Sequence, residues 1–268
     1  MSTKGIFTAV SGAMAQSARM DTIANNIANV NTPSFKKDGQ LFREYLTSYE
    51  KLNDVIEAPR DPASIESFYN MNGGDKSYAD NIGTFTDFSQ GTLKLTGNPL
   101  DIAIEGKGFF EVLTPQGVRF TRNGMFHHDA EGRIVTKDGY PVLTSGTQAP
   151  QDRVLRAPFE GQLLIGRNGE VSKNEQALGT LAVVTVKNPD AFQKVGNSLY
   201  KLRDNIAPQT GPALEYSVHQ GSVEMSNVNI IQEMTDMIGA TRVFESTQKA
   251  IQAYDQMNDK LINTVPKF

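Results

Sequence analysis

The fold of this chain is decided first by residues 6–33, which read IFTAVSGAMAQSARMDTIANNIANVNTP. Apolar or small side chains recur here at alternating steps of four and three residues, so the stretch predicts a helix whose seam is close to heptad spacing. Asn31, Thr32 and Pro33 end this helix, because proline cannot continue it and disfavours helical geometry in the residue before it. The seam positions are Ile6, Val10, Ala13, Ser17, Met20, Ala24 and Ile27, and Met14, Ile23 and Val30 widen the seam.

The last forty residues mirror this beginning and predict a second long helix. Asn229 is the candidate N-cap, and Pro266 closes the helix at its other end. Polar residues interrupt the apolar stripe of this helix, so the stripe is imperfect. The stripe consists of Ile230, Met234, Met237, Phe244, Ile251, Tyr254, Leu261 and Val265, and the interruptions are Thr241, Gln248 and Asn258.

The pattern of the two helices permits two interpretations. They could pack on the central part of the chain as ordinary core helices, or pair with each other and with neighbouring chains outside it. Long helices whose seams contain Gln, Asn and Thr suit a polar interface with several partners better than a dry core. Periodicity alone does not decide between these interpretations.

Residues 35–81 are polar and rich in turn-forming residues. A short amphipathic helix is predicted from Gln40 to Leu52, because apolar side chains fall on one side of a helical wheel there. Beyond it, Pro59, Pro62 and the run Asn72-Gly73-Gly74-Asp75 predict loop or linker.

The middle of the chain, residues 82–202, is dense in β-hairpin signals. Turns are predicted at residues 114–117 and 129–132, and two-residue hairpin turns at Asp138-Gly139 and Asn168-Gly169. Leu181 to Val186 is a β-branched run that predicts a buried strand. No recurring helical segment separates these strands, which argues against a doubly wound parallel sheet and predicts an antiparallel sandwich or small barrel. The fold class is therefore α+β.

Composition limits the chemistry and the partners. The 268 residues carry a net charge of −4 and contain no basic block, which argues against nucleic acid and anionic membrane surfaces as partners. The absence of cysteine excludes disulfides, thiolate metal sites and cysteine nucleophiles. No apolar run is long enough to span a bilayer, and Gln16, Ser17 and Arg19 interrupt the apolar residues near the N-terminus. We expect a cytosolic protein, or one exported without a cleaved signal peptide.

No catalytic, metal-binding or cofactor-binding constellation stands out. The neighbouring His127 and His128 point to opposite faces if they lie in a strand, so they cannot chelate a metal together. Gly106-Lys107-Gly108 resembles the start of a phosphate loop, but the residues that complete such a loop are missing. We therefore expect no enzyme, no metal and no cofactor. A soluble enzyme with a β-rich catalytic domain and a cell-wall-binding module remain the alternatives from other functional classes.

Five motifs in the same order resemble the flagellar basal-body rod and hook proteins, over essentially the whole chain. They are residues 25–36 (NNIANVNTPSFK), 91–110 (GTLKLTGNPLDIAIEGKGFF), 120–124 (FTRNG), 138–142 (DGYPV) and 221–229 (GSVEMSNVN). The residues that carry the resemblance most clearly are Asn25, Asn26, Asn29, Asn31, Thr32, Pro33, Phe35, Asn98, Pro99, Leu100, Gly106, Gly108, Phe109, Ser226 and Asn227. Family members usually have glycine where this chain has Ser34. Serine makes a left-handed turn residue less favourable there, so the direction in which the chain leaves the first helix stays open.

The resemblance implies an architecture, a set of partners and a location in the cell. Residues 1–33 and 228–268 would form a coiled-coil-like assembly domain, residues 34–81 and 203–227 a connector, and residues 82–202 an outer β domain. The partners would be further copies, neighbouring rod subunits and the flagellar type III export apparatus, with no nucleic acid and no membrane insertion. The location would be the rod in the periplasm. Within the family, the opening residues 5–13 (GIFTAVSGA) are closer to the proximal-rod subunit than to the distal-rod subunit. Other rod or hook-like members are the remaining alternative.

Overall fold

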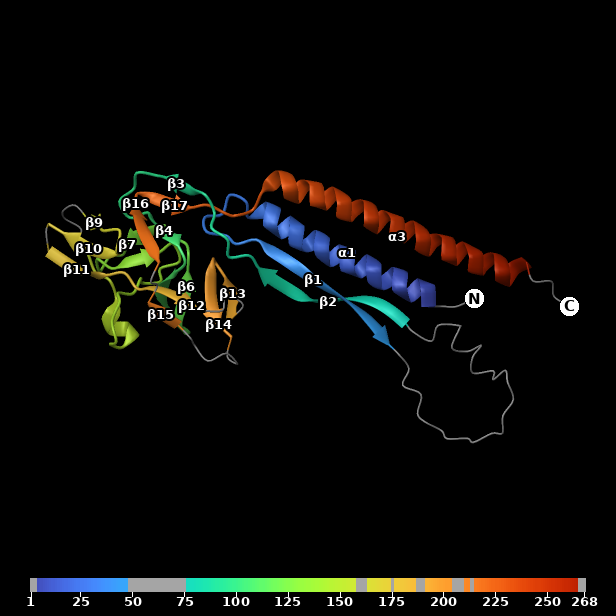
Figure 1. Ribbon diagram of the computed structural model, residues 1–268, viewed down its shortest axis with the longest axis horizontal. Helices are drawn as coiled ribbons and strands as arrows, with labels where there is room; N and C mark the ends of the chain where they lie inside the picture. The colour runs from blue at the N-terminus through green and yellow to red at the C-terminus, as the bar shows by residue number, and fades with distance from the viewer. Residues whose placement is uncertain are drawn as a thin grey trace, which may run out of the picture. The chain divides into compact units, whose positions relative to one another are not determined.

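The computed structural model describes residues 4–47, 76–157, 163–174, 176–186, 191–203, 210–212 and 215–264 (Figure 1). The chain divides into two compact units. We call Met1–Asn25, Asp38–Phe85 and Ile231–Phe268 the helical unit, and Asn26–Lys37 with Thr86–Ile230 the β unit. The chain therefore passes between the units after Asn25, Lys37, Phe85 and Ile230.

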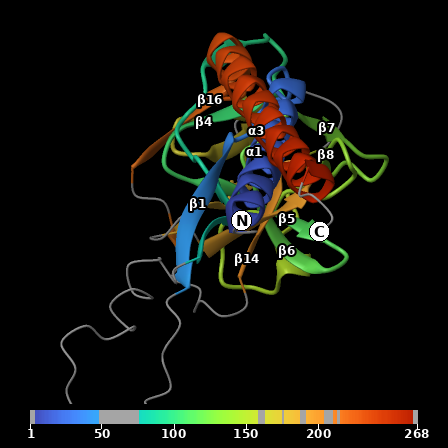
Figure 2. The same ribbon diagram turned by 90° about the vertical axis from the view of Figure 1, so that its right-hand side faces the viewer.

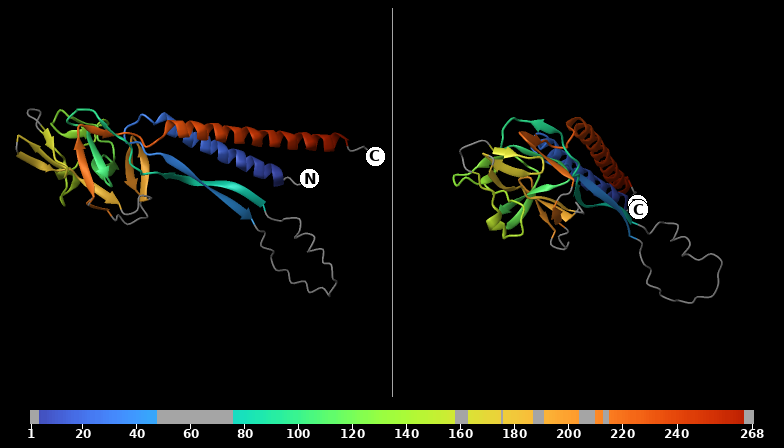
Figure 3. Two further views of the ribbon diagram at one scale, coloured as in Figure 1. Left: turned by 45° about the horizontal axis from the view of Figure 1, so that its top comes forward. Right: turned by 60° about the vertical axis from the view of Figure 1, so that its left-hand side comes forward.

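Two long helices dominate the helical unit, and both confirm the sequence prediction. Helix α1 spans Lys4–Ala28 and helix α3 spans Ile230–Thr264. They run alongside each other in opposite directions (Figures 1 and 3), and the hydroxyl of Thr241 lies 3.6 Å from the sulfur of Met20. Among the described residues, no helix is long and apolar enough to cross a membrane.

The prediction of a helix from Gln40 to Leu52 is wrong. Strand β1 (Asp38–Thr47) occupies this stretch and forms a two-stranded sheet with β2 (Lys76–Thr86), while positions 48–52 lie outside the described residues. The sheet lies along the side of α1 that faces away from α3 (Figures 1 and 2). A strand prevails because β2, distant in sequence, satisfies the backbone of β1, a pairing that helical periodicity does not detect. Gly39 of β1 leaves space for the ring of Phe85 of β2, since a Cβ at position 39 would lie 2.5 Å from this ring.

The β unit is built from antiparallel strands. Its largest sheet has six strands in the order β13-β14-β6-β5-β12-β15. A three-stranded sheet has the order β11-β10-β9, and three two-stranded sheets pair β4 with β16, β3 with β17 and β7 with β8. The strands are β3 (Leu93–Leu95), β4 (Ile102–Gly106), β5 (Phe109–Thr114), β6 (Gly117–Thr121), β7 (Phe126–His128), β8 (Ile134–Thr136), β9 (Leu163–Ile165), β10 (Glu170–Lys173), β11 (Gln176–Thr180), β12 (Val183–Val186), β13 (Phe192–Gly196), β14 (Leu199–Leu202), β15 (Thr210–Pro212), β16 (Tyr216–Gln220) and β17 (Ser222–Glu224), with a 3₁₀ turn at Pro150–Arg153.

The positions of the predicted turns in this unit are confirmed, but the type of two of them is not. Residues 114–117 join β5 to β6, and residues 129–132 lie between β7 and β8. Turns also form at Asp138-Gly139 and Asn168-Gly169, and Gly139 and Gly169 have positive φ, at 85° and 81°. The two-residue type is wrong, because the amide of Gly139 donates to the carbonyl oxygen of Thr136 and the amide of Gly169 to that of Gly166, which makes both turns one residue longer. The buried strand predicted from Leu181 to Val186 is confirmed from Val183 on, where β12 begins. Leu181 and Ala182, just before β12, and Val183 are buried.

Two apolar clusters hold the β unit together. The larger one contains the fully buried Ile102, Ile104 and Phe110, which come from β4 and β5. The smaller one is aromatic and joins Phe109 and Phe120 to Phe192 and Tyr200. The ring centroids of Phe109 and Phe192 are 4.6 Å apart, which is within the range of favourable aromatic pairs.

Candidate functional site

The helices of the helical unit carry the residues that the sequence suggested for assembly. The seam residues are distributed over the whole range of exposure, so the seam is not a single buried stripe. Ile23 is buried; Ile6, Ala13, Met20, Ile27, Val30, Met237, Phe244 and Ile251 are half-buried; Val10, Ile230, Met234 and Tyr254 are exposed. The side chains of Leu261 and Val265 lie outside the described part of the chain.

Several large apolar side chains on the helices are more exposed than the predicted seam. Phe7 and Met14 of α1 are 70% and 69% exposed, and Ile231 and Ile238 of α3 are 75% and 56% exposed. Residues 7 and 14 are seven positions apart, as are 231 and 238, so each pair lies on one helix face. Sequence reasoning passed over three of these four because it assigned a single stripe to each helix, whereas each helix here has a half-buried face and an exposed apolar face.

The inward faces of the helices use small residues. Ala15 and Ala240 are buried, and Ile23 is the third buried apolar residue among the described positions of α1 and α3. Small side chains allow helices to approach closely but remove little apolar area from water. The helical unit of a single chain therefore buries few apolar side chains for helices of this length.

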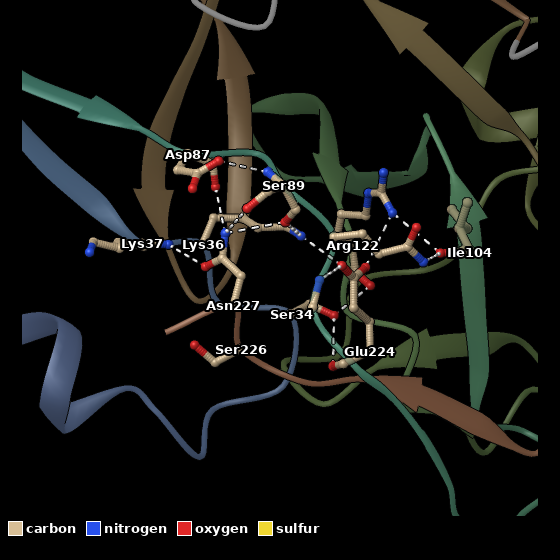
Figure 4. A network of polar contacts seen from close by, with 12 residues as sticks. Ser34, Lys36, Lys37, Asp87, Ser89, Ile104, Arg122, Glu224, Ser226 and Asn227 are labelled. Carbon is tan, nitrogen blue, oxygen red and sulfur yellow. Dashed lines mark hydrogen bonds and ion pairs between the residues drawn. The ribbon is translucent and has the colours of Figure 1, made fainter. Parts of the chain in front are cut away.

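A second site lies within the β unit, where three chain segments meet (Figure 4). We call it the junction; it consists of residues 34–37, 87–91 and 222–227 together with Arg122. Glu224 is at its centre and is fully buried. One carboxylate oxygen of Glu224 accepts hydrogen bonds from the ammonium of Lys36 at 2.6 Å and from the amide of Gly91 at 2.9 Å, and the other accepts one from Arg122 at 3.2 Å.

Arg122 links the junction to strand β4. Its guanidinium donates to the carbonyl oxygens of Gly106 at 2.6 Å and Ile104 at 3.3 Å, in addition to Glu224. It also lies over the ring of Phe109, 5.3 Å from the centroid, which adds a cation–π contact. A buried charge is tolerated only when it is paired and hydrogen-bonded, and Arg122 meets that condition.

Lys36 is equally buried, and its environment has opposing effects on its charge. The ammonium donates to the carbonyl oxygen of Ser89 at 2.7 Å as well as to Glu224. Burial lowers the pKa of Lys36 below its ordinary value, while the nearby carboxylate of Glu224 raises it. The net direction of the pKa is downward, because burial and the nearby charge of Arg122 together outweigh the effect of the carboxylates.

The structure contradicts the expectation for Ser34. This residue is fully buried and adopts a left-handed conformation, with φ at 56°. Its amide donates to the carbonyl oxygen of Glu224 at 2.9 Å, and its hydroxyl donates to the carbonyl oxygen of Arg122 at 2.7 Å. These bonds offset the strain of a left-handed serine, which is on the order of 1–2 kcal/mol.

Asn227 ties the same three segments together a second time. Its side-chain oxygen accepts from the amide of Lys37 at 2.7 Å, and its side-chain nitrogen donates to the carbonyl oxygens of Asp87 at 2.9 Å and Ser89 at 3.2 Å. Ser226, also a motif residue, is buried, and its hydroxyl accepts from the amide of Val228.

The remaining motif residues stabilise turns and cores. Thr32 donates to the side chain of Asn29 at 3.1 Å, just after α1. Asn98 donates to Asp101 at 3.1 Å in the turn before β4. The ring of Phe35 lies under the ammonium of Lys194, 4.3 Å from the centroid. Asn26, Gly108 and Phe109 are buried; Thr32, Pro33, Phe35, Leu100 and Gly106 are half-buried; Asn25, Asn31, Asn98 and Pro99 are exposed.

Sequence reasoning did not single out Lys36, Arg122 or Glu224 as site residues, although all three lie inside quoted motifs. A signal for two of them was present. Glu224 is the sole charged residue between positions 221 and 229, and Arg122 is the sole charged residue between positions 120 and 124. An isolated charge in an apolar or small-residue motif indicates a buried partner, but it does not tell which of the other motifs supplies that partner.

Parts of this chain match three family models. Residues 6–36 match the family "Flagella basal body rod protein", residues 103–173 match the "Flagellar hook protein FlgE/F/G D1 domain", and residues 219–264 match "Flagellar basal body rod FlgEFG protein C-terminal". The flagellar basal-body rod protein FlgG of Bacillus subtilis is 33% identical over 97% of this chain and 98% of its own length.

The chain belongs to the flagellar basal-body rod protein family.

Other relatives in this family carry two different subunit names. The rod protein FlgF of Caulobacter vibrioides is 30% identical over 98% of both chains. The rod protein FlgG of Borreliella burgdorferi is 34% identical over 95% of this chain and 96% of its own. The family is a structural component of the flagellum and not a class of enzymes.

Proposed function

We propose that this protein is a subunit of the flagellar rod that polymerises through α1 and α3. The exposed apolar side chains on both helices carry this proposal. Phe7, Met14, Ile231 and Ile238 are exposed by more than half in the single chain, and burying them between copies would release apolar area at roughly 25 cal/mol per Å². A helix pair that buries few apolar side chains within its own chain is completed by helices from its neighbours.

The proposed assembly is an open helical tube. Contacts between two different surfaces of one subunit do not close on themselves unless the rotation happens to make a ring, so they generate a filament. In this arrangement the pairing of α1 with α3 is coiled-coil-like, and residues 1–33 with 228–268 are the assembly domain. Residues 34–81 with 203–227 are the connector, and residues 82–202 are the outer domain of the tube.

We place the subunit in the proximal rod, as the F type. The opening Gly5-Ile6-Phe7 supports this assignment. The distal-rod G type is the second candidate, and it is supported by relatives named FlgG that are 33% and 34% identical. Expression in strains that lack either the F or the G subunit separates the two, because the protein should restore motility in one of them. Restoration in the G-deficient strain alone would overturn the assignment.

The proposed partners are further copies of this chain, the other rod subunits and the flagellar type III export apparatus. The proposed location is the rod in the periplasm, reached without a cleaved signal peptide. Mass spectrometry of the protein from purified basal bodies tests the absence of cleavage. We expect peptides that begin at Met1 or Ser2, and an N-terminus further along the chain would contradict this proposal.

A set of surface substitutions tests polymerisation through the helices. The variant Phe7→Ser, Met14→Ser, Ile231→Ser and Ile238→Ser should be absent from isolated basal bodies and should not support motility. The matched control is Leu95→Ser with Leu164→Ser, which removes apolar side chains that are 78% and 52% exposed on the β unit. This control should be incorporated normally. Normal incorporation of the helix variant would refute the proposal.

A further inference from the structure

The junction contains an ion triad whose burial calls for an explanation. Lys36 and Glu224 have no exposed side-chain surface, and Arg122 has 5%. Replacing a buried ion pair by packed apolar side chains is often neutral or stabilising, so stability alone does not account for such a group. The best-attested use of buried polar groups is to specify one register among several.

The positions of the charges suit this use. Glu224 is the sole charged residue from 221 to 229, and its neighbours in the chain are Val223 and Met225. A shift of this segment by one residue would place valine or methionine where the carboxylate now lies. Lys36 and Arg122 would then be two buried cations without Glu224 between them. The triad thus disfavours every alignment of the segment except the observed one.

The side chain of Asn227, three residues after Glu224, stabilises the same alignment of the segments. Asn227 bonds the amide of Lys37 and the carbonyl oxygens of Asp87 and Ser89, three residues after Glu224 along the chain. The amide of Ser34 bonds the carbonyl oxygen of Glu224 itself. The three segments are therefore held together at Glu224 and at Asn227. A slip of residues 222–227 by one position would break the hydrogen bonds at both residues.

We propose that Glu224, through Lys36 and Arg122, is a positioning residue that locks the register of the segments leading out of α1 and into α3. Glu224 precedes the first residue of α3, Ile230, by six positions, and a slip of one residue would advance that extended segment by about 3.3 Å. The consequence for assembly rests on the proposed function, because the helices are the surfaces that polymerise. The lock itself is a property of the isolated chain.

Two substitutions at one position separate charge from shape. Glu224→Gln keeps the size of the side chain and removes its charge, whereas Glu224→Asp keeps the charge and shortens the side chain. A lock that works by charge predicts that the Asp variant behaves like the natural protein. A role in packing alone predicts that the Gln variant does so.

The first measurement uses the purified full-length monomer and does not depend on assembly. Amide signals of Ser34, Lys37 and Gly91 are followed by nuclear magnetic resonance. We expect one set of signals for the natural protein and for Glu224→Asp, and two or more sets for Glu224→Gln. A single set in Glu224→Gln with slow exchange of the Ser34 amide, or loss of cooperative unfolding in both variants, would overturn the lock and leave a structural role only.

The second measurement is incorporation into basal bodies. We expect Glu224→Gln to be incorporated about tenfold less than the natural protein, and Glu224→Asp within about threefold of it. Equal or better incorporation of the Gln variant would overturn the proposal. Failure of the natural protein to enter the rod would instead contradict the proposed function, while the signals of the monomer would still decide on the lock.

Discussion

The β unit and the helical unit differ in how they treat apolar side chains. In the β unit, Ile102, Ile104 and Phe110 are completely buried, and even charged side chains are enclosed and paired. In the helical unit, Phe7 and Ile231 are exposed by 70% and 75%. The first unit has closed apolar clusters within one chain, although Leu95 and Leu164 are exposed on its surface. The second has apolar surface left over, which is the state expected of a surface that is buried only when copies meet.

The largest effect we expect tests how closely the β unit is packed. A Cβ added at Gly124 would lie 1.5 Å from the carbonyl oxygen of Ile102, which no side-chain movement can relieve. Gly124→Ala should therefore destabilise the β unit by about 4–5 kcal/mol, at the upper end for single substitutions. Urea denaturation followed by near-ultraviolet circular dichroism measures this. A loss below about 1 kcal/mol would show that the backbone yields there.

The same substitution made in each unit sharpens the comparison. Phe110→Ala removes a fully buried ring that lies edge-on to Phe126, and it should cost about 3–5 kcal/mol. Phe7→Ala removes an exposed ring and should change monomer stability by no more than about 0.5 kcal/mol. Incorporation into basal bodies should be reduced by Phe7→Ala although the monomer is unaffected. If Phe7→Ala destabilised the monomer as much as Phe110→Ala, the contrast between the units would be lost.

A glycine in α1 gives a smaller effect of opposite sign. A Cβ at Gly12 would touch nothing within 4 Å, and glycine inside a helix is less favourable than alanine by about 0.8–1 kcal/mol. Gly12→Ala should therefore increase helix content and stability of the monomer, as measured by far-ultraviolet circular dichroism. We expect incorporation to fall, because a neighbouring copy would use the space. Higher stability with unchanged incorporation would show that α1 is free of close contacts at this position.

The smallest effect concerns pH and the buried Lys36. Burial lowers the pKa of Lys36, and Arg122 lowers it further, while Glu224 and Asp87 raise it. Between the lowered pKa and 10.5 the unfolded chain binds more protons at this residue than the folded chain, so stability should rise with pH in this window. Lys36→Met should make the rise shallower, as measured by urea denaturation at several pH values below 10.5. Identical slopes in both proteins would contradict the lowered pKa.

The sequence by itself determined the features that depend on neighbouring residues. The two long helices follow from a period of three to four residues, and the turns at Asp138-Gly139 and Asn168-Gly169 follow from the need for positive φ. The ordered motifs also indicated the family. The same local reasoning failed at residues 40–47, where the spacing of apolar side chains suggested a helix and pairing with β2 produced a strand.

Only the tertiary structure decided the junction and the faces of the helices. Lys36 and Glu224 are separated by 188 residues, and Arg122 and Glu224 by 102, so nothing local relates them. Ser34 adopts a glycine-like conformation because Arg122 and Glu224 accept its hydrogen bonds, which its own neighbours could not reveal. Whether an apolar residue of α1 or α3 is buried or exposed depends on where the other elements lie. Periodicity finds an apolar face, but contact with a distant segment determines whether water is excluded from it.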